Sequence, residues 1–287
     1  MAYEFTTQTT AEAVFDRIIT FATANGWTLE QSYDASGVKG RALHSEGISE
    51  QESITALLFF RTSTATTPTR LIRVGGAAGL YHDTPSTAAS EVDFYNQPSA
   101  DAGPYHALWN GGTGDIPLHI WVNADRIAWC SRSDSRWMFA HVGILRRFGA
   151  RAQVPYPLWL CGNTNATNQA WDNSAMQNWP IGTLSGSDPV RVLDAVGTWG
   201  GIGIQRALPY AHDLSWGGRN ADGDYGLEEV VVYRTNGGAT GTPYGIYYCS
   251  PEGLVSGNEI AIGGDDYIVF ENVYRGQSGG FMAIIKE

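Results

Sequence analysis

Three oxygen-bearing side chains in the C-terminal half have the spacing of a calcium-binding loop. Asn220, Asp222 and Asp224 stand at alternate positions in "NADGDYGLEE", as the first ligands of such a loop do. Tyr225 replaces the glycine of the sharp turn, and Val231 stands where a bidentate glutamate is needed. The pattern therefore leaves these three residues as a weak calcium candidate, and an ordinary acidic turn is the favoured interpretation.

Other catalytic signatures are missing from the sequence. Its six histidines never stand two to four positions apart, and Cys130, Cys161 and Cys249 are far from one another, so no zinc spacing is present. No phosphate-binding loop and no Gly-x-Ser-x-Gly elbow occurs. We expect His119 and His141 to be core or interface imidazoles and the cysteines to be reduced core thiols. The sequence thus predicts no enzyme activity, no metal and no cofactor.

Sugar chemistry remains an alternative. Glycoside hydrolysis needs two facing carboxylates, and the chain holds 29 acidic residues and ten tryptophans that could stack on sugars. No pair of carboxylates stands out, and most large aromatic side chains belong to protein cores because each buries a large apolar area. A glycan-binding or glycan-cleaving protein is therefore kept as an alternative function.

Charge and composition narrow the classes of partner. The 287 residues carry a net charge of −11, which repels DNA and anionic lipid, so we expect neither nucleic acid nor membrane as a partner. Among 18 basic residues only Lys39 and Lys286 are lysines. Arginine enrichment fits either contact surfaces or the codon bias of a GC-rich genome. The N-terminus lacks the features of a secretion signal and no long apolar run occurs, so we expect a cytoplasmic protein before assembly.

One helix is predicted near the start of the chain. Thr9 and Glu12 have the spacing of a capping box, and apolar residues recur after them at helical intervals. Asn25 and Gly26 form a typical left-handed helix end. We expect Trp27, just beyond, to pack on a neighbouring sheet.

Short strands separated by turns are predicted for most of the remaining chain. The segment 119–145 is a meander with apolar residues on both faces, so we expect this sheet to be covered on both sides. The glycine-rich stretch 197–205 predicts tight turns. The resulting fold class is mainly β (α+β), with the N-terminal helix packed on antiparallel sheets in a sandwich-like arrangement. A soft boundary separates residues 1–150, the helix and antiparallel sheet, from 151–287, a β-rich and loop-rich part, unless both form one continuous domain.

Several structural motifs along the chain occur together. They are an aromatic strand, an arginine-containing hairpin, a Gly-x-Leu strand and an extended proline segment, carried by Arg126, Gly143, Leu145, Tyr156, Pro157, Leu158, Gly162 and Asn163. The closing runs "YIVFENVYRG" and "FMAIIKE" and the helix end "NGWT" accompany them. In these motifs the chain resembles a group of virion structural proteins of tailed bacteriophages.

The resemblance implies a structural subunit of a phage virion, assembled in the bacterial cytoplasm in many copies at the neck, tail or baseplate. Its partners would be copies of itself and other virion proteins, with a host-surface glycan as a further candidate ligand. A capsid decoration protein is a second alternative function. We expect contact surfaces in a long polar loop, in a tryptophan-bearing segment, at the acidic turn of Asp222 and at the end of the meander. The interface candidates are Asp93, Phe94, Tyr95, Trp171, Trp179, Arg146 and Arg147.

Overall fold

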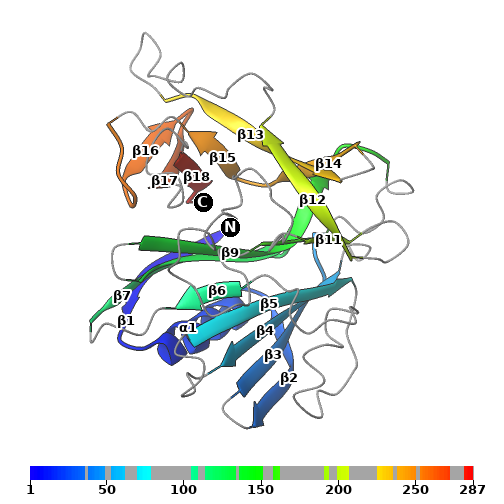
Figure 1. Cartoon of the computed structure of the whole chain (residues 1–287), viewed down its shortest axis with the longest axis vertical. Coiled ribbons are helices and arrows are strands. Elements are labelled where there is room, and N and C mark those ends of the chain that lie inside the picture. Colours follow the sequence, from blue (N-terminus) through cyan, green and yellow to red (C-terminus); the bar gives the residue numbers. More distant parts are fainter. Residues whose placement is uncertain are drawn as a thin grey trace.

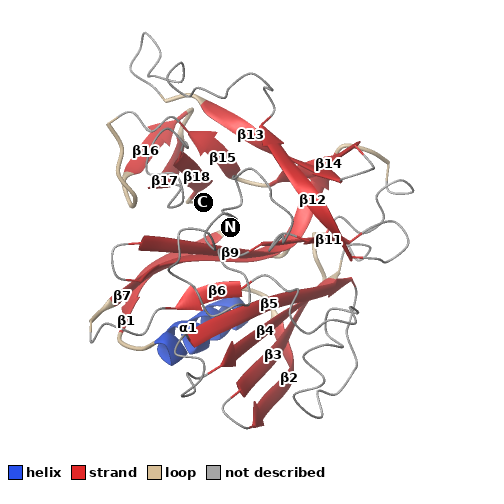
Figure 2. Ribbon diagram, in the orientation of Figure 1, coloured by secondary structure: helices blue, strands red, loops and turns tan. Residues whose placement is uncertain are grey.

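The structure is a computed structural model. It describes residues 1–35, 38–48, 53–61, 70–78, 105–108, 114–133, 136–150, 158–161, 191–193, 199–206, 225–234, 238–249, 253–271 and 281–286. Within these ranges the chain forms one helix, α1, and strands β1 to β18, which make two antiparallel sheets (Figures 1 and 2). The predicted class, mainly β with an N-terminal helix packed on antiparallel sheets, is confirmed.

The smaller sheet has five strands from the first part of the chain. Each strand pairs antiparallel with the next, in the order β2 (Thr28–Ala35), β3 (Val38–Ser45), β4 (Ile54–Arg61), β5 (Arg70–Ala78) and β6 (Tyr105–Leu108). A register shift between Leu29 and Gln31 interrupts the pairing of β2 with β3. The edges of this sheet are therefore a bulged strand, β2, and a short one, β6.

The larger sheet has thirteen strands and includes the meander. Its first half is β1 (Ala2–Gln8), β7 (Ile116–Asn123), β8 (Arg126–Ser133), β9 (Arg136–Arg147) and β10 (Leu158–Cys161). Its second half is β11 (Arg191–Leu193), β12 (Trp199–Arg206), β13 (Leu227–Arg234), β15 (Ile246–Cys249), β18 (Phe281–Ile285), β17 (Asp265–Glu271) and β16 (Glu259–Ile262). Strand β14 (Gly238–Pro243) pairs with both β9 and β13 and so joins the two halves. The division of the chain near residue 150 stays a prediction.

Strand β12 corrects the expectation of tight turns in the glycine-rich stretch 197–205. Residues 199–201 of this strand pair with β11, and residues 202–206 pair with β13. Glycine weakens an isolated strand. Each residue of β12 nevertheless has a partner on a neighbouring strand, and backbone pairing of this kind does not depend on the side chains.

Three layers make up the molecule, with the first half of the larger sheet in the middle (Figure 1). One face of this middle layer is mainly aliphatic, apart from Trp129, and packs on α1 and the smaller sheet; its other strand residues include Leu118, Ile120, Val122, Ile127, Val142 and Leu160. The other face is aromatic and packs on β13, β15, β17 and β18; its residues include Trp121, Trp137, Phe139 and Trp159. The prediction that the meander is covered on both faces is confirmed.

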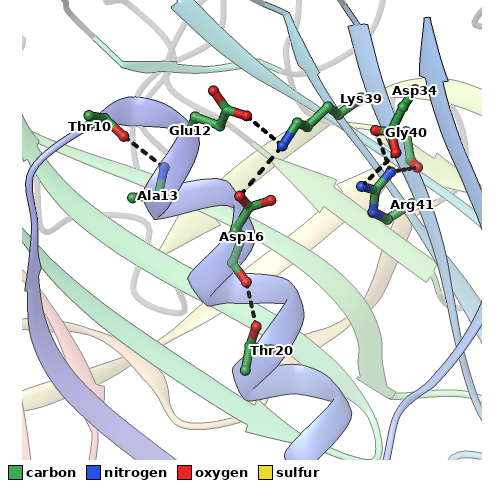
Figure 3. A network of polar contacts seen from close by, with 9 residues as sticks. All are labelled: Thr10, Glu12, Ala13, Asp16, Thr20, Asp34, Lys39, Gly40 and Arg41. Atoms are coloured by element: carbon green, nitrogen blue, oxygen red, sulfur yellow. Dashed lines mark hydrogen bonds and ion pairs between the residues drawn. The ribbon is translucent and has the colours of Figure 1, made fainter.

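Helix α1 (Ala11–Ala24) begins one residue later than the sequence pattern suggests. Thr10, rather than Thr9, is the N-cap, and its hydroxyl oxygen accepts a hydrogen bond from the Ala13 amide at 3.0 Å (Figure 3). Glu12 therefore occupies the second helical position instead of the third, where a capping box needs it. Its carboxylate instead lies 2.5 Å from the ammonium of Lys39 on β3 (Figure 3).

The predicted helix end is confirmed. Gly26 has a φ of +96°, a backbone conformation that glycine adopts without steric penalty. Trp27 then turns back onto the middle layer, where it is buried and its indole nitrogen donates a hydrogen bond to the Asn123 carbonyl oxygen at 2.8 Å. None of the residues that the structure describes forms a helix long and apolar enough to cross a membrane.

Candidate functional site

The aromatic face of the middle layer is built by strand register. The pairing of β1 with β7 sets Tyr3 opposite Trp121 and Phe5 opposite His119. On the next strand, β8, the residues opposite Trp121 and His119 are the small Ala128 and Cys130. Large rings on β7 and β9 thus flank small side chains on β8, which lets them pack without voids. Cys130 is a buried free thiol, and burial raises its pKa, so it is an inert core residue.

His119 lies where this face meets the second half of the sheet. Its Nδ1 is 2.8 Å from the Tyr3 hydroxyl, and its ring centroid is 4.6 Å from Phe5, 5.1 Å from Trp137 and 5.3 Å from Phe270. Burial lowers its pKa to about 4, because the aromatic surroundings solvate an imidazolium poorly. His119 is therefore neutral at physiological pH, and the prediction of a core imidazole is confirmed.

The two ends of the chain meet beside His119. The Lys286 ammonium lies 2.9 Å from Glu259 and 5.4 Å from the centre of the Tyr3 ring. Burial, followed by the charge of Glu259, raises the pKa of Tyr3, so its hydroxyl stays protonated. We call Tyr3, His119, Glu259 and Lys286 the seam cluster. Its groups contact one another and join β1 to the C-terminal strands, so the cluster holds the two halves of the larger sheet together.

His141 is the second buried imidazole of the aromatic face. Its Nδ1 lies 3.3 Å from the Trp159 carbonyl oxygen, and its Nε2 has no hydrogen-bond partner among the described residues. Burial, with a further contribution from the charge of Arg126, lowers its pKa well below the ordinary value. His141 is thus also neutral and belongs to the core, as predicted.

A second cluster lies where the turns between β7 and β8 and between β14 and β15 meet. Arg126 is 1% exposed, donates a hydrogen bond to the Tyr244 carbonyl oxygen and lies with its guanidinium 2.8 Å from the Met1 sulfur. Gly143 faces it across the β8–β9 pair. A Cβ atom at Gly143 would lie 2.4 Å from Arg126 Cβ, so only glycine leaves room for this buried arginine.

The exposed part of this second cluster holds the one interface candidate that the structure shows on the surface. Arg146 is exposed, and its guanidinium lies 3.8 Å from the centre of the Tyr244 ring. Phe148, two residues on, is 55% exposed. We call Arg146, Tyr244 and Phe148 the arginine–tyrosine patch. Planar arginine and aromatic side chains are enriched in protein interfaces, so the patch is suited to binding another protein.

The other predicted site residues have different positions. Arg147 is half-buried and pairs with Gly241 of β14 at the end of β9. The remaining candidates lie outside the described residues: Asp93, Phe94, Tyr95, Trp171, Trp179, Asn220, Asp222 and Asp224. Within the part of the chain that the structure describes, no group of three or more His, Cys, Asp or Glu side chains is placed to hold a metal ion.

Sequence reasoning missed a set of exposed apolar side chains. Among the described residues, large hydrophobic side chains are exposed at Phe5, Leu29, Ile48, Phe148 and Val255. Phe5 and Leu29 lie on edge strands, β1 and β2. The run "AYEFTTQ" alternates between two faces and contains β-forming residues, a signal that identifies β1 once a partner strand is known.

Comparisons with protein families and with curated proteins give no match: no protein-family model matches the sequence, and no curated protein matches it significantly. The resemblance to phage virion proteins therefore depends on the sequence motifs alone.

Proposed function

We propose that the protein is a structural subunit of a tailed-phage virion and assembles in many copies at the neck, tail or baseplate. The observation that carries the proposal is the arginine–tyrosine patch, where the exposed guanidinium of Arg146 stacks on Tyr244 and the exposed Phe148 follows two residues later in the chain. Such side chains contribute strongly to binding between proteins because they present large, rigid surfaces. The biological setting of the proposal comes from the sequence motifs, which resemble those of virion proteins.

The use of the two lysines supports a surface built for contact. Lys39 binds Glu12 and Lys286 binds Glu259, so both form ion pairs within the chain. Arginine supplies the exposed cation of the patch. Arginine loses its hydration more easily than lysine and binds carboxylates in a fork geometry, which favours it at interfaces.

The scaffold beneath the patch is closely packed. The middle layer is packed on both faces. The patch lies at the end of β9 and on the turn between β14 and β15, to which Arg126 donates its hydrogen bond. Binding surfaces on such elements lose little conformational entropy when a partner docks. The net charge of −11 keeps free copies apart, since like-charged molecules repel at long range.

The proposal is tested on particles of the phage that carries this coding sequence. Antibody fragments raised against the purified chain are bound to purified particles, which are imaged by electron microscopy. Label at the neck, tail or baseplate of most particles supports the proposal. Absence of the chain from the particles, measured by mass spectrometry, overturns it.

Two further outcomes of this experiment contradict the proposal in informative ways. Label spread over the shell would identify a capsid decoration protein instead. Binding of the purified chain to defined glycans on an array, together with label at fibre tips only, would identify a receptor-binding protein.

Arg146→Glu serves as a matched variant: it reverses the charge of the patch on an exposed side chain, and we expect it to lower incorporation into particles without unfolding the chain.

A further inference from the structure

The larger sheet ends in two edge strands, β1 and β16. An edge strand presents unpaired backbone N–H and C=O groups that another strand can bind, and natural proteins normally protect such edges by short length, bulges, proline or charge. The smaller sheet ends in β2 and β6. These four edges differ in how well they are protected.

Three of the edges are protected. Strands β6 and β16 are four residues long, and β16 also carries the Glu259–Lys286 ion pair. Strand β2 contains the register shift at Leu29 and carries the acidic Glu30 and Asp34. Each of these features hinders the addition of a further strand.

Strand β1 lacks these protections. Its seven residues pair with β7 in one unbroken register, and among the described residues no strand lies on its other side. It contains no proline and no lysine. Its single charged residue, Glu4, accepts a hydrogen bond from Arg17 Nε at 2.7 Å and is thereby neutralised. The exposed Phe5, with 56% of its surface accessible, stands at the centre of the strand.

The sequence of β1 is complementary to itself. If two copies pair antiparallel about a two-fold axis at Phe5, all seven residues, Ala2 to Gln8, find a partner. Phe5 then faces Phe5 of the second copy, Tyr3 faces Thr7 and Glu4 faces Thr6. No charge lies opposite a like charge, and aromatic and threonine pairs are favourable across antiparallel strands.

Charge also selects this edge for a second copy. Two chains of net charge −11 repel each other, so contact is least unfavourable where the local charge is balanced. Strand β1 meets this condition through the Glu4–Arg17 pair. We infer that β1 pairs antiparallel with β1 of a second copy of this chain, about a two-fold axis at Phe5, and so continues the larger sheet from one subunit into the next.

This dimer rests on the proposed many-copy assembly for its biological role, but its test uses the purified full chain alone. In Phe5→Cys, two new thiols face each other across the axis, where Cβ atoms of directly opposed residues lie about 4.5–5.5 Å apart. In the matched variant Thr7→Cys, also exposed on β1, the two new thiols stand four residues apart along the paired strands, on the order of 13 Å. Both variants are oxidised mildly at raised salt, which screens the repulsion between copies.

We expect Phe5→Cys to form a disulfide-linked dimer at least about ten times faster than Thr7→Cys, measured by non-reducing gel electrophoresis. Equal rates for both variants, or no cross-link in Phe5→Cys at high protein concentration, overturn the inference. Circular dichroism melts establish that both variants fold.

Sedimentation of Phe5→Lys provides a second readout: opposed lysines should weaken the dimer, whereas Leu29→Lys on the edge of the smaller sheet should leave it unchanged. If the purified chain forms this dimer but phage particles do not contain the chain, the proposed function is refuted and the β1 pairing stands. If particles carry the label but the purified chain forms no dimer, the β1 pairing is refuted and the proposed function stands.

Discussion

The guanidinium of Arg126 donates a hydrogen bond to the carbonyl oxygen of Tyr244, although 118 positions separate the two residues in sequence. The bond joins the first residue of β8 to the turn between β14 and β15. Arg126 is buried, and its guanidinium also lies 5.7 Å from the Tyr244 ring, which the exposed Arg146 contacts at 3.8 Å. A buried cation therefore supports the residue on which the surface patch is built.

Replacing Arg126 by lysine should destabilise the protein. Lysine keeps the positive charge, but its single ammonium cannot reproduce the fork geometry of the guanidinium, and hydrogen bonds to charged groups contribute about 1.5–3 kcal/mol. We expect the free energy of unfolding of Arg126→Lys, measured in urea, to be about 2 kcal/mol lower than that of the wild type. The control is Arg146→Lys, whose exposed contact with Tyr244 contributes about 0.5–1 kcal/mol. Equal losses in the two variants would show that the buried bond does not support the turn.

The close approach of Gly143 to Arg126 predicts a second large effect. In Gly143→Ala the new methyl group would lie 2.4 Å from Arg126 Cβ and 2.7 Å from the Asp125 carbonyl oxygen, so β8 and β9 must separate. Overpacking of this kind costs about 1–3 kcal/mol. At Gly114 a Cβ atom meets nothing within 4 Å, so Gly114→Ala should unfold at the same urea concentration as the wild type or slightly above it. A Gly143→Ala protein as stable as Gly114→Ala would contradict the described register.

The stability of the fold should fall in mild acid because of His119. Its pKa is lowered to about 4 in the folded chain from 6.5, so the unfolded chain binds more protons between these values. The free energy of unfolding therefore decreases by about 3 kcal/mol as the pH falls from about 6.5 to about 4. Below that pH, His119 lowers it no further. His141, whose pKa is also lowered by burial, contributes with the same sign.

The variant His119→Phe isolates this contribution, since phenylalanine suits the surrounding rings but does not titrate. We expect the difference in the free energy of unfolding between pH 7 and pH 4.5 to be smaller in the variant than in the wild type by up to about 3 kcal/mol. Loss of the Tyr3 hydrogen bond lowers the free energy of unfolding equally at both pH values, so it cancels in the difference between them. An unchanged pH dependence would mean that His119 is not held neutral by the aromatic face.

The helix cap provides a test of the structure against the sequence pattern. Thr10→Ala removes the hydroxyl that accepts from the Ala13 amide, and loss of such a cap costs about 1 kcal/mol. Thr9→Ala should change stability little. Thermal unfolding followed by circular dichroism measures both, and a larger loss for Thr9→Ala would restore the capping box as the true helix start.

Local patterns in the sequence were sufficient to predict many of the elements. The helix, its end at Asn25 and Gly26 and the return of Trp27 all follow from residues close in the chain. The two apolar faces of the meander follow from alternation, because successive strand side chains point to opposite sides. Composition and periodicity also placed the chain among mainly β proteins. The predicted sites in the segments outside the described residues stay predictions.

Pairing over long distances in the chain was decided by the tertiary structure alone. The sequence does not show that β1 pairs with β7, that β14 joins β9 to β13, or that Lys286 returns to Tyr3. Nor does it distinguish the buried Arg126 from the exposed Arg146, two arginines in similar strand-like runs. The physical reason is that alternation specifies which face of a strand is buried, whereas the choice of neighbour depends on how whole surfaces fit together once the chain has closed its loops.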